Sequence, residues 1–514
     1  MIGMLRSFSG TEDAFLITWA VFLGIALIIV IGSGIYLLLR GKLRIHQIFF
    51  ITVFGMGVIF SFVLPPLSAP DEVLHYVGAY QLSSQIMGHP HPLRDEKNQL
   101  MIRKEDVFID DLPDDGDPDN ATVVGMHLEK STYEELHKRG LLSTGESGYT
   151  YTLQQPVVTI PCAYLFPAIG FTIARLLKLG GFGMLYLGRF MNLLLFTLMG
   201  MLAVRKTPIG KELIFGVSLF PMVLELVSSL SYDTYILALG FYLTATILEL
   251  ALSDRQIRWQ DAAEIGILAV LLSPCKMVYC VLFAACLIIP ARKWKNPGYY
   301  LATIALIGGL IVLSIVLVNF SQFFRYVDLS GTTATEAEWA GEGAAAETYS
   351  LMGTLKTPVI FLKILRNTFQ IKGVEYLLTM VGHWMGGYDP GLTVSVPIVI
   401  FFIAAVLLLS VSGTRDEPKL GAGKRLWLFV TVLLLVVLLL TSMLVAYTPK
   451  GTDYALGVQG RYFLPALPML LITLRGRWMS ASGSKSLSRL VLSLELLMNG
   501  YILLNLYTIV CQRV

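Results

Sequence analysis

One stretch of the chain places an acidic pair and a histidine directly after an apolar run. The run Ile48 to Leu64 is followed by Pro-Pro-Leu-Ser-Ala-Pro and then by Asp71, Glu72 and His75. Such a run predicts a membrane-spanning helix, so the two carboxylates would lie where that helix leaves the bilayer. Carboxylates are costly to desolvate there and often have a function. A carboxylate partly withdrawn from water can act as a general base.

The two acids are neighbours, so on a helix their side chains point about 100° apart. Only one of them is therefore expected to face a given reactant. Pro70 suits the first turn of a helix, which would put Glu72, His75 and Tyr76 on one stripe of that helix. The alternative is that Asp71 and Glu72 only balance the positive end of the helix dipole.

Other polar residues fall near the ends of apolar runs at the same predicted depth: Arg189, Asp233, Lys276, Tyr279, Arg461 and Tyr462. Each of them alone fits a structural ion pair or a snorkelling side chain. Together, two acids and three cations at one level, in a chain with 15% charged residues, predict a site for an anionic ligand. An arginine would hold a phosphate through two parallel hydrogen bonds, and a lysine would act as a point charge.

The composition assigns the chain to the polytopic membrane proteins. Of its 514 residues 55% are hydrophobic, and its mean hydropathy is +0.67. A soluble globular protein has about 25% charged residues, well above the fraction found here. The net charge of +3, spread over short basic clusters, predicts a lipid bilayer and no nucleic acid as partner. The five cysteines show no metal-ligand spacing.

Apolar runs predict an all-α fold with about 12 transmembrane helices in a single domain, residues 1–514. The candidates are residues 14–39, 46–66, 184–204, 212–230, 234–252, 261–275, 278–291, 299–319, 391–412, 426–447, 460–474 and 488–510. Every second connection is rich in lysine and arginine, which predicts the cytoplasmic side. This scheme places outer loops at 67–183 and 320–390, with both chain ends outside, in a multi-pass protein of the bacterial cell membrane.

Two further segments are apolar but are interpreted as re-entrant or interfacial helices on the outer face. They are residues 358–382 and the segment Val157 to Leu177, which directly follows Pro156 and contains Pro161 and Pro167. The first outer loop also contains the acidic run 110–117, whose carboxylates suit a divalent cation but lack the spacing of a calcium loop. We therefore expect no certain cofactor and keep a divalent metal as an option.

At this point the sequence resembles a known bacterial membrane family, domain of unknown function 2142. The resemblance rests on the Pro-Pro-x-x-x-Pro-Asp-Glu-x-x-His-Tyr string and on strings around Arg189, Asp233, Lys276 and Arg461, and it extends from about Pro65 to Leu471. That family is similar to the GT-C superfamily of integral membrane glycosyltransferases. The similarity implies a catalytic acid at the position of Asp71 and a cation near the lipid phosphate at the position of Arg461.

The chain departs from the GT-C pattern in two ways. An extra apolar segment, 14–39, precedes the helix that delivers Asp71. After Gln154-Gln155-Pro156 it has Val-Val-Thr where a further proline and an aromatic pair are expected. The extra segment should not affect the chemistry, whereas the second departure concerns the jaw helices that the superfamily places in the first outer loop.

These features predict an inverting glycosyltransferase that moves a sugar from a polyprenyl-phosphate donor to an acceptor glycan on the outer face. The acceptor would be a cell-wall or surface glycopolymer, or its lipid-linked precursor. Asp71 would be the base, with Glu72 beside it, and Arg461 would hold the phosphate. The remaining substrate contacts are assigned to His75, Arg189, Asp233, Lys276, Tyr279 and Tyr462. The alternatives are a transporter or flippase for a lipid-linked glycan, or an O-antigen-type polymerase or ligase.

Overall fold

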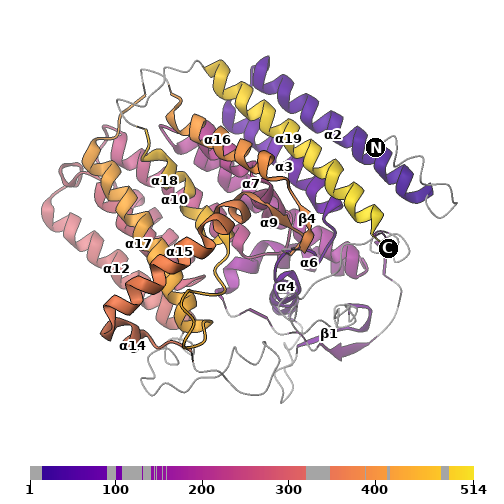
Figure 1. Cartoon of the computed structure of the whole chain (residues 1–514), viewed down its shortest axis with the longest axis horizontal. Helices are drawn as coiled ribbons and strands as arrows, with labels where there is room; N and C mark the ends of the chain where they lie inside the picture. The colour runs from indigo at the N-terminus through magenta and orange to yellow at the C-terminus, as the bar shows by residue number, and fades with distance from the viewer. Residues whose placement is uncertain are drawn as a thin grey trace.

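The computed structural model describes most of the chain. The described residues are 14–88, 100–106, 130, 133, 141–143, 145, 148–152, 154, 156–157, 159–319, 348–387, 389–413, 417–475 and 485–513. They form a helical bundle with two small two-stranded antiparallel sheets (Figure 1). The acidic run 110–117 and residues 320–347 of the predicted second outer loop lie outside the described residues.

Seven helices of the described part are long and apolar enough to cross a membrane. They are α2 (Ala14–Leu39), α3 (Ile45–Val63), α7 (Gly181–Lys206), α10 (Asp233–Leu252), α12 (Pro297–Val318), α17 (Ala422–Ala446) and α19 (Lys485–Gln512). Each coincides closely with one of the twelve predicted spans. The all-α membrane class is therefore confirmed, whereas the number of twelve spans stays a prediction.

The other predicted spans are shorter or broken. They correspond to α8 (Lys211–Ser218) with α9 (Pro221–Val227), α11 (Trp259–Leu272), the 3₁₀ helix η5 (Met277–Ile288), α16 (Val396–Val411), and the 3₁₀ helix η8 (Gly460–Ala466) with α18 (Leu467–Ile472). Prolines account for two of the breaks, because proline lacks the amide hydrogen that an α-helix needs. Pro221 opens α9 after Phe220 has turned to an extended ψ of 134°. Pro465 lies inside η8, and a second proline follows at the start of α18.

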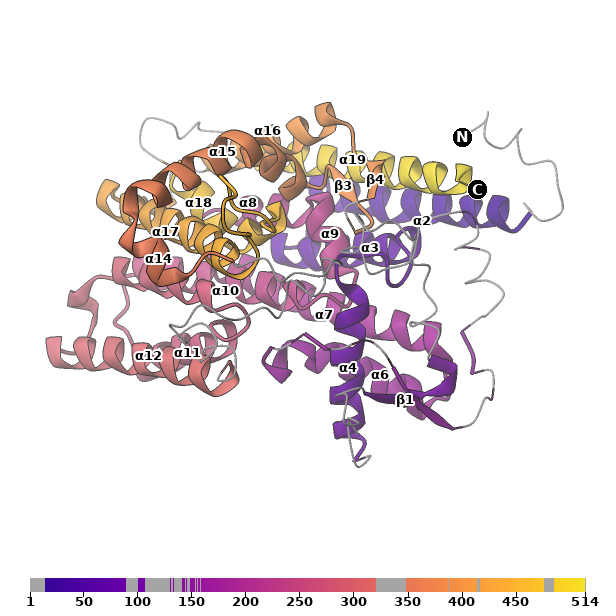
Figure 2. The ribbon, with the colours of Figure 1, turned by 60° about the horizontal axis from the view of Figure 1, so that its bottom comes forward.

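The two ends of the described chain meet. Figures 1 and 2 show α2 and α19 side by side, and the Tyr507 hydroxyl near the end of α19 donates to the Leu16 carbonyl near the start of α2 at 2.7 Å. The Tyr133 hydroxyl donates to the Val63 carbonyl at the end of α3 at 2.5 Å, and its ring lies 5.4 Å from that of Tyr507. The start of α2 and the end of α19 therefore lie on the same side of the bundle as the end of α3.

The described part of the first loop packs as a small helical unit against α7. It contains α4 (Glu72–Ile86), the strand pair β1 (Met101–Arg103) and β2 (Tyr149–Tyr151), the 3₁₀ helix η4 (Pro161–Tyr164), and α6 (Leu165–Leu176). Helix α6 crosses α7 closely because glycines stand at the crossing. A Cβ on Gly170 would lie 2.7 Å from the Leu187 carbonyl oxygen, and one on Gly188 would lie 2.4 Å from the Phe171 ring. Helix α4 packs against α6, so the crossing of α6 and α7 also sets the position of α4.

A second unit holds η8 in place. It contains α14 (Leu351–Lys356), α15 (Pro358–Val381), and the strand pair β3 (Trp384–Met385) and β4 (Asp389–Thr393). The short 3₁₀ helix η6 (Ala291–Lys293) instead follows η5 in the chain. Helix α15 covers η8, and a Cβ on Gly460 would lie 2.3 Å from the Tyr376 carbonyl oxygen. On its other side η8 contacts α10, where a Cβ on Gly240 would lie 2.9 Å from the Pro465 carbonyl oxygen. Only glycines allow these approaches, which bring Arg461 into the bundle.

Candidate functional site

The turn between α3 and α4 is strained, and it carries Asp71. Leu67 and Asp71 have φ of 70° and 57°, in the left-handed region that costs residues other than glycine about 1–3 kcal/mol. Asp71 is the N-cap residue of α4, whose first helical residue is Glu72. The helix therefore begins later than the Pro70 pattern predicted. Backbone strain of this kind is concentrated at functional sites, so this turn is a candidate by geometry as well as by sequence.

Glu72 and Arg189 form a closed, buried network. The guanidinium donates to the Glu72 carboxylate from Nε at 2.7 Å and from Nη2 at 2.5 Å. Its remaining hydrogens reach the carbonyls of Ser61, Leu64 and Pro65 at 3.3, 2.6 and 2.8 Å, so all five guanidinium donors are used. The carboxylate also accepts from the backbone amides of Leu230 and Ala69. Both side chains are almost completely buried, at 0% and 1% exposure.

Asp71 belongs to a second, more open cluster. The Arg461 Nη2 atom donates to its carboxylate at 2.7 Å across 390 positions of the sequence. The Arg461 Nε atom lies 3.5 Å from the Asp233 carboxylate, which accepts from the Lys276 ammonium at 3.0 Å. Exposure decreases from the mouth of the cluster inward: the side chain of Asp71 is 45% exposed, that of Lys276 18%, that of Asp233 10% and that of Arg461 2%.

Aromatic rings lie next to the two cations of this cluster. The Lys276 ammonium lies 4.0 Å from the centroid of the Tyr462 ring and 5.1 Å from that of Tyr232. The Arg461 guanidinium carbon lies 5.4 Å from the Tyr462 ring. The Tyr279 hydroxyl donates to the backbone carbonyl of Tyr462 at 2.9 Å, which holds the backbone that carries this ring. Rings in these positions stabilise both cations through their π faces.

His75 lies beneath the cluster and is buried. Its Nδ1 atom is 2.8 Å from the Tyr164 hydroxyl and its Nε2 atom is 3.5 Å from the Ser231 hydroxyl. Its ring packs edge-on against Tyr232 at 4.9 Å. Burial lowers the pKa of His75 to about 4, so the imidazole is neutral at pH 7. In this state it joins α4 to η4 and to the start of α10 as a hydrogen-bonding group.

The pKa of the Asp71 carboxyl is lowered. Partial desolvation raises its pKa, but the Arg461 charge and hydrogen bond outweigh that effect, so the pKa of Asp71 lies below its ordinary value. Asp71 is therefore ionised at neutral pH. A carboxylate with a lowered pKa is also a weaker base, so this ion pair restrains the residue predicted to take a proton.

The described residues offer no set of ligands for a metal ion. Among them no group of three or more histidine, cysteine, aspartate or glutamate side chains converges on one point. Both Glu72 oxygens already accept hydrogen bonds from protein donors. A metal at the described cluster would have to displace these partners or those of Asp233.

Comparison with known proteins identifies a family. Residues 54–470 match the family described as "Predicted membrane protein (DUF2142)". The chain belongs to this family. No curated protein and no solved structure matches it. The matched range in this DUF2142 protein contains all nine predicted site residues, from Asp71 to Tyr462.

The structure divides those nine residues between the two networks. It brings seven of them together around Asp71: Asp71, His75, Asp233, Lys276, Tyr279, Arg461 and Tyr462. The other two, Glu72 and Arg189, pair with each other. The sequence analysis did not assign the neighbouring residues Tyr164, Ser231 and Tyr232 to the site. They are uncharged, and the prediction relied mainly on charged residues near the ends of apolar runs.

Two buried acids in the helical bundle were also missed. Glu225 on α9 accepts from the Gly386 amide at 2.7 Å. Glu495 on α19 is 0% exposed, and neither of its oxygens has a hydrogen-bond partner among the described residues. Each is an acid inside an apolar run, and that pattern was available in the sequence as a signal for a buried carboxyl.

Proposed function

We propose that this DUF2142 protein is a glycosyltransferase of the GT-C type. It would transfer a sugar from a polyprenyl-phosphate donor to an acceptor glycan, with inversion, at the outer face of a bacterial cell membrane. The observation that carries the proposal is the convergence on Asp71: a half-exposed carboxylate on a strained turn, bonded at 2.7 Å to Arg461 and linked to Lys276 through three successive ion pairs. The basic clusters of alternate connections support the outward orientation.

This reaction needs one general base and a binding site for the phosphate leaving group. The oxygen of an acceptor hydroxyl would attack the anomeric carbon while its proton passes to Asp71. The bond from the anomeric carbon to the phosphate oxygen would break, and the polyprenyl phosphate would leave with the electron pair. Arg461 and Lys276 would stabilise the negative charge that grows on this leaving group. A single displacement of this kind inverts the anomeric centre.

The cluster at rest balances two carboxylates, Asp71 and Asp233, against two cations, Arg461 and Lys276. A donor phosphate would therefore have to compete with Asp71 for Arg461. Once Arg461 turned to the phosphate, the carboxylate would lose the partner that lowers its pKa and would become a stronger base. Binding of the donor would thus activate the base.

We assign Glu72 and Arg189 to positioning. Every donor of the Arg189 guanidinium is engaged within the protein, so it retains none for a phosphate. Its bonds to the carbonyls of Leu64 and Pro65 instead hold the end of α3 against the start of α4. The strained turn that presents Asp71 is anchored by this network on both sides.

The direct test uses purified protein and a panel of radiolabelled polyprenyl-phosphate sugars with glycan acceptors. The proposal expects label in the glycan with at least one donor, and loss of that transfer in Asp71→Asn. Glu375→Gln is a matched control, because Glu375 is also an ion-paired acid, bonded to Lys372 on the surface of α15. Transfer that survives Asp71→Asn, or no transfer with any donor of the panel, would reject the proposal.

A second candidate is a transporter or flippase for a lipid-linked glycan. The observation in its favour is Glu495, a buried acid well inside a membrane-length helix. Acids at such depth are common in proton-coupled transport. A fluorescent lipid-linked glycan in proteoliposomes separates the candidates: movement across the bilayer without sugar transfer, abolished by Glu495→Gln, would favour transport. An O-antigen-type polymerase or ligase remains the other alternative, and it would join whole glycans rather than single sugars in the same assays.

A further inference from the structure

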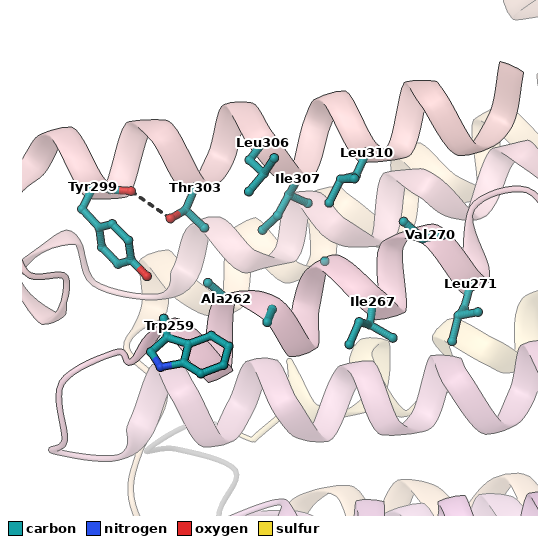
Figure 3. A pocket seen from close by; sticks show the side chains of 12 residues that line it. Trp259, Ala262, Ile267, Val270, Leu271, Tyr299, Thr303, Leu306, Ile307 and Leu310 are labelled. Carbon is teal, nitrogen blue, oxygen red and sulfur yellow. Dashed lines mark hydrogen bonds between the residues drawn. The ribbon is translucent and has the colours of Figure 1, made fainter. Parts of the chain in front are cut away.

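Helices α11 and α12 enclose an apolar groove away from the polar cluster. The two helices run side by side in the same direction, and Figure 3 shows Trp259 and Tyr299 at one end of the groove and Leu271 and Leu310 at the other. The groove has a volume of about 540 Å³, within the range of small-ligand sites. Its polar side chains, Trp259, Tyr299 and Thr303, lie at the first end, where the Thr303 hydroxyl is already bonded to the Tyr299 carbonyl.

The apolar end of the groove leads toward the cluster. Five residues after Leu271 the chain reaches Lys276, whose ammonium is bonded to Asp233. The end of α12 is tied to the same connection, because the Asn319 side-chain amide donates to the Pro274 carbonyl at 3.1 Å. An occupant that follows the groove past Leu271 therefore approaches the two cations of the site.

Helix α12 has the surroundings expected of a wall that faces lipid. It lies at an edge of the bundle in Figures 1 and 2, and only 11% of its most apolar window is buried. Large apolar side chains on α12, such as Leu301 and Leu317, are more than half exposed. A long lipid chain can thus enter the groove sideways from the bilayer while its headgroup stays near Lys276, beyond the Leu271 end of the groove.

We propose that this groove binds the isoprenoid chain of a polyprenyl phosphate whose phosphate lies at Lys276 and Arg461. The inference rests on the proposed function and adds where the lipid part of the donor is held. The lining is apolar along the length a hydrocarbon chain would occupy, and the cations stand at the end where the phosphate of that chain would emerge. A groove of this volume suits one chain, as in a polyprenyl phosphate, better than the two chains of a phospholipid.

Two substitutions of the same kind test the groove. A Cβ on Gly266 of α11 would lie 3.4 Å from Leu310 across the groove, in ordinary contact, so Gly266→Leu fills the groove without forcing the backbone apart. Gly308→Leu on α12 is the matched control, because a Cβ there meets nothing within 4 Å. Ala263→Trp fills the groove at a second position and guards against an unstable Gly266 variant.

The experiment uses the full chain in nanodiscs and a photoreactive polyprenyl phosphate that carries no sugar. We expect crosslinked peptides from α11 and α12, at least a ten-fold loss of crosslinking in Gly266→Leu and Ala263→Trp, and no change in Gly308→Leu. A ten-carbon prenyl phosphate should compete almost equally in wild type and in both groove variants, since it extends less far along the groove.

Crosslinks elsewhere, undiminished crosslinking in both groove variants, or equal competition by phosphatidylglycerol would overturn the inference. The last result would mean that the groove takes any membrane lipid. Because the probe has no sugar, its binding is independent of transfer. Groove crosslinking together with failure of every sugar donor would reject the glycosyltransferase alone, whereas transfer from a long-chain donor that is unaffected by Gly266→Leu would reject the groove alone.

Discussion

Asp71 and Glu72 are neighbours in the chain but belong to opposite kinds of ion-pair network. The Glu72–Arg189 network is sealed, with both side chains at 1% exposure or less and every guanidinium donor engaged. The Asp71–Arg461 pair lies in a cluster whose outer carboxylate is 45% exposed. The difference shows how one turn can supply both a rigid support and an accessible acid: the left-handed backbone at Asp71 points the two carboxylates to different partners.

A fully satisfied buried network is expected to stabilise the fold, and an accessible one is expected to act on ligands. Breaking one side of a buried pair leaves an uncompensated charge, whereas an exposed pair contributes little to stability. The two networks should therefore respond in opposite ways to substitution, the first in stability and the second in activity. The predictions below run from the largest expected effect on stability to the smallest.

The largest loss of stability should follow a break in the closed network. Glu72→Gln leaves the Arg189 charge buried without its carboxylate, so the free energy of unfolding should fall by about 3–5 kcal/mol. The measurement is thermal or denaturant unfolding in detergent, with Glu375→Gln as the surface control. A Glu72→Gln protein as stable as the control would show that the two networks are not different in kind.

His75 should make stability depend on pH in a defined window. Its pKa is about 4 in the folded protein, lowered from 6.5 mainly by burial, so between these values the unfolded chain binds a proton that the folded chain does not. Stability should therefore be complete above pH 6.5 and decrease by roughly 3 kcal/mol as the pH falls to 4. His75→Gln should flatten this part of the profile. An unchanged slope in that variant would place the titration elsewhere.

Arg461 should matter more for the donor than for the fold. Arg461→Lys keeps the charge but loses the fork geometry, so donor affinity should weaken by about 1.5–3 kcal/mol. Without donor, unfolding should shift by less than about 1 kcal/mol, because the Asp71 partner is half exposed. Melting curves with and without donor measure both effects. A large loss of stability without donor, at unchanged donor affinity, would make the pair purely structural.

The smallest effect is expected at Glu495. Its carboxyl is buried and has no hydrogen-bond partner among the described residues, so its replacement breaks no bond described there. Glu495→Gln replaces it with a neutral group of similar shape, so stability should change by less than about 1 kcal/mol, and sugar transfer should continue. Loss of function with a stable fold would instead point to a proton-coupled role.

The sequence was informative where charged residues stand at the ends of apolar runs. The run before Pro65 predicted the helix that ends at Val63, and charged residues at the ends of other runs predicted most of the open cluster. Charge is scarce in this chain, so each charged residue near a membrane boundary has few alternatives to a site or an ion pair.

The partners of those charges could not be predicted in the same way. Arg189 and Glu72 are 117 positions apart, and only the packing of α3 and α6 against α7, with α4 packed on α6, brings them together. Hydropathy also joined α8 and α9 into one span, because it does not register the backbone break before Pro221. Neutral neighbours such as Tyr164 are identified only by contact.

The central claim is that Asp71 acts on substrate while Glu72 supports it. The most direct measurement is sugar-transfer turnover and thermal stability of Asp71→Asn, compared with wild type in the same preparation. We expect a turnover about 10²–10⁴-fold lower, the usual contribution of a general base, with the melting transition almost unchanged. Wild-type turnover in Asp71→Asn, or a collapse of its stability like that expected of Glu72→Gln, would contradict it.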